Sequence, residues 1–154
     1  MAVDTATRVF FDASSLFVAA NSPEVGSAFL ISVCSRGFLQ AVASPDVLLE
    51  AERNIDEKGR SGAARRYREL IATTRFLMAS APTEHVVRQY ADVFIEDAHV
   101  IAAALSVRSD YIITLDQRFE RRVMAAALGV TALSPKAFLQ TILPDHSDYI
   151  EIRS

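Results

Sequence analysis

Short runs rich in β-branched and aromatic residues alternate along the chain with stretches whose apolar residues recur at helical spacing. The runs that we predict to be strands cover residues 8–11, 38–43, 75–79, 111–115 and 130–133. Such alternation is typical of a parallel sheet covered by helices. The hydrophobic pattern therefore predicts an α/β fold.

Two kinds of signal mark the helices between these strands. Apolar residues at 25, 28, 29 and 33, and again at 98, 101, 102 and 105, follow the stripe of an amphipathic helix. Three Ser-Pro pairs, at 22–23, 44–45 and 134–135, place a capping hydroxyl before a proline at the first helical position. We predict that a helix starts at each pair.

The composition indicates one soluble domain with a sizeable core. The chain has 154 residues, of which 51% are hydrophobic and 23% charged. Its apolar stretches fall short of the roughly 20 residues of a membrane span, and the lone Cys34 forms no internal disulfide, so we expect a cytoplasmic protein. Its three histidines are scattered and have no cysteine partners, so any metal must be held by oxygen.

Basic residues are unevenly distributed although the net charge is −3. Six basic residues and one acid lie between positions 58 and 75, and a smaller basic group follows at 118–122. Arginine, which makes up most of these groups, favours contact with phosphate. The alternative is a solvated helix face. The candidate phosphate contacts are Arg65, Arg66, Arg68 and Arg118.

Four carboxylates fall at related places in the predicted elements. Asp12 and Asp116 each follow an apolar strand, at the sheet edge where open α/β folds bind ligands. Glu50 lies on the second turn of the helix that leaves from the same edge, and Asp97 opens a later helix. Each has a structural alternative, since Asp12, Asp97 and Asp116 suit helix starts and Glu50 suits a helix surface.

Taken together, the four acids favour a metal site. Ionised carboxylates within a few ångströms repel by roughly 4 kcal/mol per close pair at an effective dielectric constant of 20, so a cluster needs a cation or protons. Clusters of oxygen ligands suit Mg²⁺ or Mn²⁺. Such ions can activate water and assist displacement at phosphorus.

Three segments, RVFFDASSLF, SPDVLLEAERNI and EDAHVIAAALSVRSDYIITLDQRF, resemble the PIN domain of VapC-like toxins and related ribonucleases in order and spacing. The resemblance covers about residues 8–143, which gives a PIN-like domain over 1–143 and a C-terminal tail over 144–154. It places the family's acids on Asp12, Glu50, Asp97 and Asp116, with Ser14 as a supporting hydroxyl.

The same resemblance implies a three-layer fold with strand order 3-2-1-4-5 and a metal-dependent endoribonuclease activity on RNA. It also implies an antitoxin partner and a homodimer. Thr114 matches a threonine often found near the family's site, whereas His99 departs from the small or aliphatic residue that is usual there.

Neighbouring polar residues are assigned to the surface. His99 lies about 200° around a helix from Asp97, which favours a surface or partner-facing role. Asp110 precedes a strand and Glu96 turns away from Asp97, so both are expected to be solvated. The tail is expected to be either a loose end or a strand that pairs with another chain.

Three functional interpretations remain. The first is a nuclease in which the four acids hold one or two divalent ions. The second is a PIN-type binding or assembly module with little or no activity. The third is a phosphoacceptor domain using Asp12 and Lys136, which is disfavoured because Asp12-Ala13-Ser14 lacks the Asp-x-Asp of phosphatases.

Overall fold

In the computed structural model, which describes residues 2–154, five parallel strands form the central layer. They are β1 (Arg8–Phe11), β2 (Gln40–Ala43), β3 (Leu77–Met78), β4 (Tyr111–Ile113) and β5 (Thr131–Leu133). Their order is β3-β2-β1-β4-β5, with Val9 opposite Ala41 on one side and Tyr111 on the other. The parallel sheet and the order 3-2-1-4-5 are confirmed.

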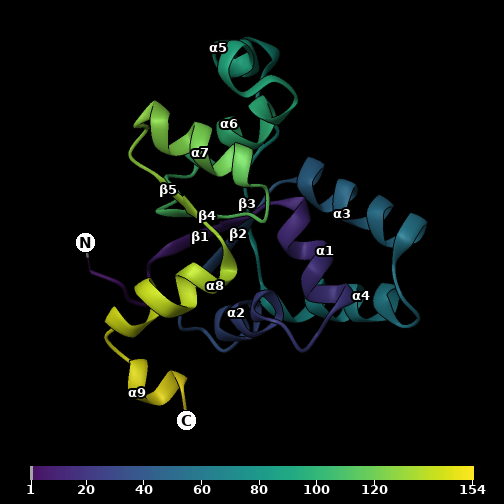
Figure 1. Ribbon diagram of the computed structural model, residues 1–154, viewed down its shortest axis with the longest axis vertical. Helices are drawn as coiled ribbons and strands as arrows, with labels where there is room; N and C mark the ends of the chain where they lie inside the picture. The colour runs from purple at the N-terminus through teal and green to yellow at the C-terminus, as the bar shows by residue number, and fades with distance from the viewer. Residues whose placement is uncertain (1) are drawn as a thin grey trace.

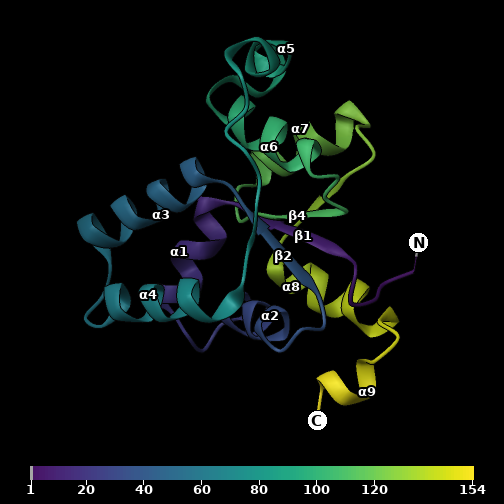
Figure 2. The same ribbon diagram turned by 180° about the vertical axis from the view of Figure 1, so that it is seen from behind.

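Helices cover both faces of this sheet, as Figures 1 and 2 show. One layer holds α5 (Glu84–Phe94), the short 3-10 turn η1 (Ile95–Asp97), α6 (Ala98–Ser106) and α7 (Gln117–Ala126). The other holds α1 (Ala13–Asn21), α2 (Gly26–Ser35), α3 (Pro45–Lys58), α4 (Ala63–Thr74) and α8 (Pro135–Ala137), with α1 packed against α2, α3 and α4.

The strands are buried because both faces of the sheet are covered. Phe10 and Phe11 on β1 and Ile112 and Ile113 on β4 are fully buried. This explains why these strands are continuous apolar runs without alternation. The core between the two helix layers fixes the strand ends that carry the candidate site.

Two of the three predicted Ser-Pro helix starts are confirmed. The hydroxyls of Ser44 and Ser134 accept hydrogen bonds from the backbone N–H groups three residues ahead, at the starts of α3 and α8. The prediction for Ser22 is wrong, because α1 extends to Asn21 and the Ser22 N–H caps its end by donating to the Val18 carbonyl. The next helix begins only at Gly26.

The C-terminal residues are docked on the domain. After the π-helical turn η2 (Phe138–Ile142) and the 3-10 turn η3 (Leu143–Asp145), the chain forms α9 (Tyr149–Ile152), in which Ile152 is buried. His146 is buried, and its Nε2 donates to the Phe38 carbonyl over 2.6 Å while its Nδ1 accepts from the Asp148 N–H over 2.9 Å. The tail is therefore neither a loose end nor a strand; the boundary at 143/144 stays a prediction.

Within the described residues no single helix is long and apolar enough to span a bilayer. Helices α1 and α2 reach the required length and hydropathy only when taken together, and the chain bends by 98° between them.

Candidate metal centre

Asp12 stands at the carboxyl end of β1 and caps α1. Its Oδ1 accepts hydrogen bonds from the Ser15 N–H (2.9 Å) and from the Ser14 hydroxyl (2.7 Å). Burial raises the pKa of this carboxyl, and the hydrogen bonds from Thr114, Ser15 and Ser14 act in the opposite direction. The residue predicted to belong to the site therefore also caps α1.

Asp116 follows β4 and caps the start of α7, which is the structural role given above as the alternative to metal binding. Its Oδ1 accepts from the N–H groups of Arg118 (2.9 Å) and Phe119 (3.1 Å), and its own N–H donates to the Thr114 hydroxyl (3.0 Å). The Ser14 hydroxyl accepts from the Leu115 N–H (3.1 Å), which ties the ends of β1 and β4 together. Ser14 and Thr114 therefore orient the two strand-end acids.

Strand order changes direction between β1 and β4, because β2 lies on one side of β1 and β4 on the other. Ligands of open α/β folds bind at such a switch point, outside the carboxyl ends of the strands. Asp12 and Asp116 both lie there.

Asp97 connects all four predicted acids electrostatically. It is half-buried at the end of η1, and its side chain makes no capping hydrogen bond to α6. Burial raises its pKa most, followed by the negative charges of Asp116, Glu96, Asp12 and Glu50. The carboxylates of Asp116, Asp12 and Glu50 therefore lie close enough to Asp97 for their negative charges to raise its pKa.

The same side chains are not gathered into a chelating cluster. Among residues 2–154, no three histidine, cysteine or acidic side chains lie close enough together to hold one metal ion as they stand. Mutual repulsion opposes closer approach of like charges. One oxygen each of Asp12 and Asp116 is also committed to helix capping.

A cleft of about 320 Å³ opens beside these acids, between the start of α3 and the η1–α6 junction. It is lined by Asp46, Leu49, Glu50, Arg53, Glu96, Asp97 and His99. Asp46 and Arg53 were not predicted from the sequence, although helical spacing places both on the side of Glu50, since they lie four residues before and three after it on α3.

His99 and Glu96 share the cleft with Asp97. His99 Nδ1 lies 4.0 Å from Asp46 Oδ2. The 100° per residue spacing of an α-helix does not apply between Asp97 and His99, because Asp97 belongs to η1, before the regular turns of α6. Glu96 is exposed, as expected, while Asp110 accepts a hydrogen bond from the Arg8 N–H at the opposite sheet edge (2.8 Å).

The backbone turns sharply just before Asp97. Ile95 closes α5 with φ 54° and ψ −121°, and its side chain is 58% exposed. A β-branched residue rarely adopts positive φ, which is a strained conformation. This turn sets the direction from which Glu96 and Asp97 reach the site.

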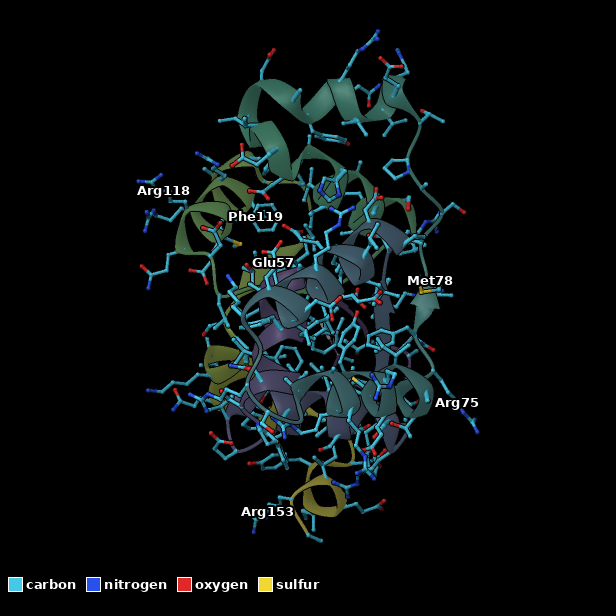
Figure 3. The ribbon with its side chains drawn as sticks, turned by 90° about the vertical axis from the view of Figure 1, so that its right-hand side faces the viewer. Glu57, Arg75, Met78, Arg118, Phe119 and Arg153 are labelled. Carbon is cyan, nitrogen blue, oxygen red and sulfur yellow. The ribbon has the colours of Figure 1, made fainter. Side chains whose placement is uncertain are left out.

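The predicted basic residues have different environments. Arg66 donates to the Ala20 carbonyl at the end of α1 (2.6 Å), and Arg65 forms an exposed ion pair with Glu69 (3.2 Å). Arg118 is exposed at the start of α7, two residues after Asp116, and points into solvent in Figure 3. Of the four predicted arginines, Arg118 lies nearest in sequence to a candidate site acid, Asp116.

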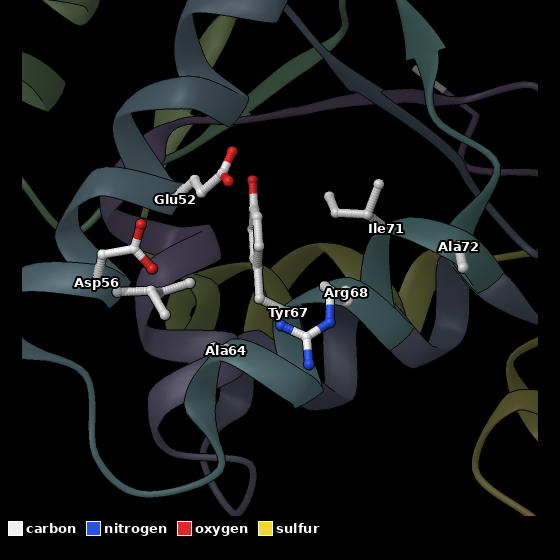
Figure 4. A pocket seen from close by; sticks show the side chains of 8 residues that line it. Glu52, Asp56, Ala64, Tyr67, Arg68, Ile71 and Ala72 are labelled. Carbon is white, nitrogen blue, oxygen red and sulfur yellow. The ribbon is translucent and has the colours of Figure 1, made fainter.

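Arg68 lines a different hollow, between α3 and α4. Figure 4 shows it beside Tyr67, whose hydroxyl donates to the Leu48 carbonyl over 2.8 Å and so ties the two helices together. Burial and the nearby charge of Glu52 raise the pKa of Tyr67 to about 12. This hollow contains none of the four candidate site acids.

Solved structures of other proteins share the fold. PAE2754 from Pyrobaculum aerophilum is 15% identical and superposes with a TM-score of 0.61, covering 96% of each chain. VapBC2 from Rickettsia felis, bound to a promoter DNA fragment, is 11% identical with a TM-score of 0.56 over 83% of this chain and 98% of its own. The sarcin-ricin loop cleaving toxin VapC20 of Mycobacterium tuberculosis is 15% identical with a TM-score of 0.54, covering 79% and 98%.

No curated protein matches the chain in a sequence comparison. The family model of the PIN domain, in contrast, matches residues 8–118, which span β1 to the start of α7 and include all four candidate acids. The chain belongs to the PIN domain family.

Proposed function

We propose that the protein is a divalent-metal-dependent endoribonuclease that hydrolyses RNA phosphodiester bonds. The observation that carries the proposal is that the PIN domain match spans all four acids, of which Asp12 and Asp116 end neighbouring strands at the sheet's switch point while Glu50 and Asp97 line the cleft beside them. Negative charge concentrated at a ligand-binding edge is the arrangement that a cation would stabilise.

The donor set fits Mg²⁺ or Mn²⁺. All four side chains are carboxylates, which are the hard oxygen ligands that these ions prefer, and such ions commonly keep waters and substrate phosphate in their remaining positions. Asp12, Glu50, Asp97 and Asp116 would hold the ion. When bound, it would supply a Lewis acid that lowers the pKa of water and offsets charge on the phosphate.

The chain's own groups have distinct tasks in this proposal. The hydroxyls of Ser14 and Thr114 fix the orientation of Asp12 and the backbone at Asp116. Arg118, exposed beside Asp116, contacts an RNA phosphate. No nucleophilic side chain is required.

A cleavage assay tests the proposal. A labelled single-stranded RNA pool is incubated with the protein in Mg²⁺, in Mn²⁺ and in EDTA, next to Asp97→Asn and the control Asp56→Asn, which changes an exposed acid on α3. We expect metal-dependent cuts that Asp97→Asn abolishes and Asp56→Asn retains. If the folded protein binds the ions yet cuts no RNA, the alternative of a binding or assembly module is favoured.

We further propose that the protein is the cytoplasmic toxin of a toxin–antitoxin pair and forms a homodimer. The structural likeness to VapBC2 of Rickettsia felis and to the toxin VapC20 of Mycobacterium tuberculosis supports the first part. Leu49 on α3, Val93 on α5 and Ile95 at the end of α5 are exposed apolar side chains that a second copy would cover. A growth assay with and without the neighbouring reading frame tests the pair, and sedimentation of Val93→Glu tests the dimer.

A further inference from the structure

Arg53 is the one arginine or lysine among the residues that line the cleft between α3 and the η1–α6 junction. Four carboxylates line the same cleft, and two of them, those of Glu50 and Asp97, belong to the candidate metal centre. Arg53 lies one turn after Glu50 on α3, and its side chain is exposed. Its guanidinium therefore borders the site directly.

This guanidinium is not paired with an acid. The spacing on α3 offers two partners, since Glu50 lies three residues before Arg53 and Glu57 four residues after it. Among the described residues, however, no carboxylate oxygen lies within 4.0 Å of its nitrogen atoms. Arg65 on α4 and Arg88 on α5, in contrast, each pair with a glutamate four residues away. The positive charge of Arg53 is thus available to a ligand of the cleft.

Phosphate is the ligand that this position suits. A guanidinium binds phosphate oxygens through two parallel hydrogen bonds, which favours it over other cations for this task. The carboxylates of the cleft repel an approaching polynucleotide, and a positive charge beside them offsets part of that repulsion. Because Arg53 is exposed, a phosphate can reach it without any rearrangement of the core.

Arg53 and Arg118 lie on opposite sides of the acids. Helix α3 follows β2 and helix α7 follows β4, and these two strands flank β1 on its two sides. The two helices also belong to different layers, as Figures 1 and 2 show. Asp12, at the end of β1, therefore lies between the helix that carries Arg53 and the helix that carries Arg118. A single strand that contacts both arginines passes over the candidate metal centre.

We propose that Arg53 is a substrate-binding residue that holds a phosphate of the RNA beside the one at the acids. The RNA backbone then crosses the candidate metal centre from Arg118 on α7 to Arg53 on α3. The assignment of RNA rests on the proposed nuclease function. Arg53 orients the strand and takes no part in breaking the phosphodiester bond.

RNA binding in the absence of cleavage tests this role. A labelled single-stranded RNA of mixed sequence is titrated with the protein at several salt concentrations and followed by fluorescence anisotropy. The titrations use the otherwise unchanged protein in EDTA and, in Mg²⁺, the Asp97→Asn protein, which is expected not to cut.

Replacing Arg53 should weaken binding in a way that depends on salt. Arg53→Gln should raise the dissociation constant about tenfold, which is the loss of one hydrogen bond to a charged group. The slope of log affinity against log salt should become shallower by about 0.7, because one phosphate contact is lost. Arg53→Lys keeps the charge and should restore most of this slope. A residue that only supported the fold would not change the slope.

Arg75→Gln is the matched control. Arg75 is exposed and precedes β3 at the opposite edge of the sheet, and Figure 3 shows its side chain pointing into solvent. The change removes the same charge from the protein, and it should leave the dissociation constant and the slope close to those of the parent protein. If Arg75→Gln and Arg53→Gln weaken binding equally, the effect comes from net charge and the proposal is overturned.

Combining Arg53→Gln with Arg118→Ala tests the path of the strand. Residues that contact different phosphates contribute independently, so the double variant should lose twice the slope that either single variant loses. A double variant that loses no more than Arg118→Ala alone would show that the RNA does not extend to Arg53.

The outcomes also separate this assignment from the nuclease. If the protein cuts RNA while Arg53→Gln binds RNA as Arg75→Gln does, the role of Arg53 is wrong and the nuclease stands. If Arg53→Gln weakens binding but no RNA is cut with either ion, the nuclease is wrong and Arg53 serves RNA binding alone. A folded protein that binds no RNA would overturn both.

Discussion

Replacing Asp97 with asparagine should stabilise the protein in the absence of metal. The Asp97 carboxylate makes no capping hydrogen bond, and its pKa is raised by burial and by the charges of Asp116, Glu96, Asp12 and Glu50. Asparagine has nearly the same shape and no charge. The substitution therefore removes repulsion without removing a contact.

The size of the effect follows from Coulomb's law. The carboxyls lie beyond the distance at which three of them share an ion. At a representative separation of about 8 Å, two unit charges repel by about 0.5 kcal/mol in water and about 1 kcal/mol at an effective dielectric constant of 40. Asp97 has several such neighbours, and its partial exposure weakens each repulsion. Removing its charge should therefore raise the free energy of unfolding by about 1–2 kcal/mol, which corresponds to a rise in melting temperature of about 2–8 °C.

The pH dependence gives the sign of the effect. A carboxyl whose pKa is raised on folding binds its proton more tightly in the folded state. The loss of folding stability that its charge causes is absent below about pH 4 and is complete once the pH has risen above the folded pKa. Thermal melts in EDTA should therefore show a gain at pH 7 that vanishes below about pH 4. An Asp97→Asn protein that melts below its parent at pH 7, while Asp56→Asn melts with it, would refute the reasoning.

Three further predictions concern other parts of the molecule. Arg118→Ala should make the slope of log affinity for single-stranded RNA against log salt shallower by about 0.7. The control Arg65→Ala removes a residue paired with Glu69 and should leave this slope unchanged. Fluorescence anisotropy at several salt concentrations measures both slopes. Asp116→Ala removes two capping hydrogen bonds from α7 and should cost about 1 kcal/mol in a denaturant titration, whereas asparagine should restore it. His146→Ala should lower the melting temperature by on the order of 10 °C, because it leaves the partly buried partners of two hydrogen bonds unpaired; calorimetry checks this value.

The strands and the positions of two acids could be predicted because they depend on local pattern. Continuous apolar runs identify strands buried on both faces, and parallel strands place Asp12 and Asp116 at one edge. Binding of a metal ion by Asp12, Glu50, Asp97 and Asp116 remains a prediction. What the structure adds is the electrostatic influence of Asp12, Glu50 and Asp116 on Asp97.

Other features depend on contacts between distant segments or on a local break in the helix, and could not be predicted. Helical spacing counted from Asp97 did not place His99 in the cleft beside that acid, because Asp97 belongs to η1, before the regular turns of α6. The Ser-Pro motif at Ser22 does not start a helix, because α1 continues to Asn21 and the apolar residues of α1 pack on the core. The docking of the tail through His146 needs Phe38, more than 100 positions away.

Ile95 is a position at which thermostability and activity should conflict. Its backbone, at φ 54° and ψ −121°, occupies a region that glycine adopts without steric cost, so Ile95→Gly is an obvious choice for raising the melting temperature. The same change would loosen the link between α5 and the η1 turn that carries Asp97. Selection for stability alone would thus relax the positioning of this carboxylate, whereas selection for turnover would retain the strained isoleucine.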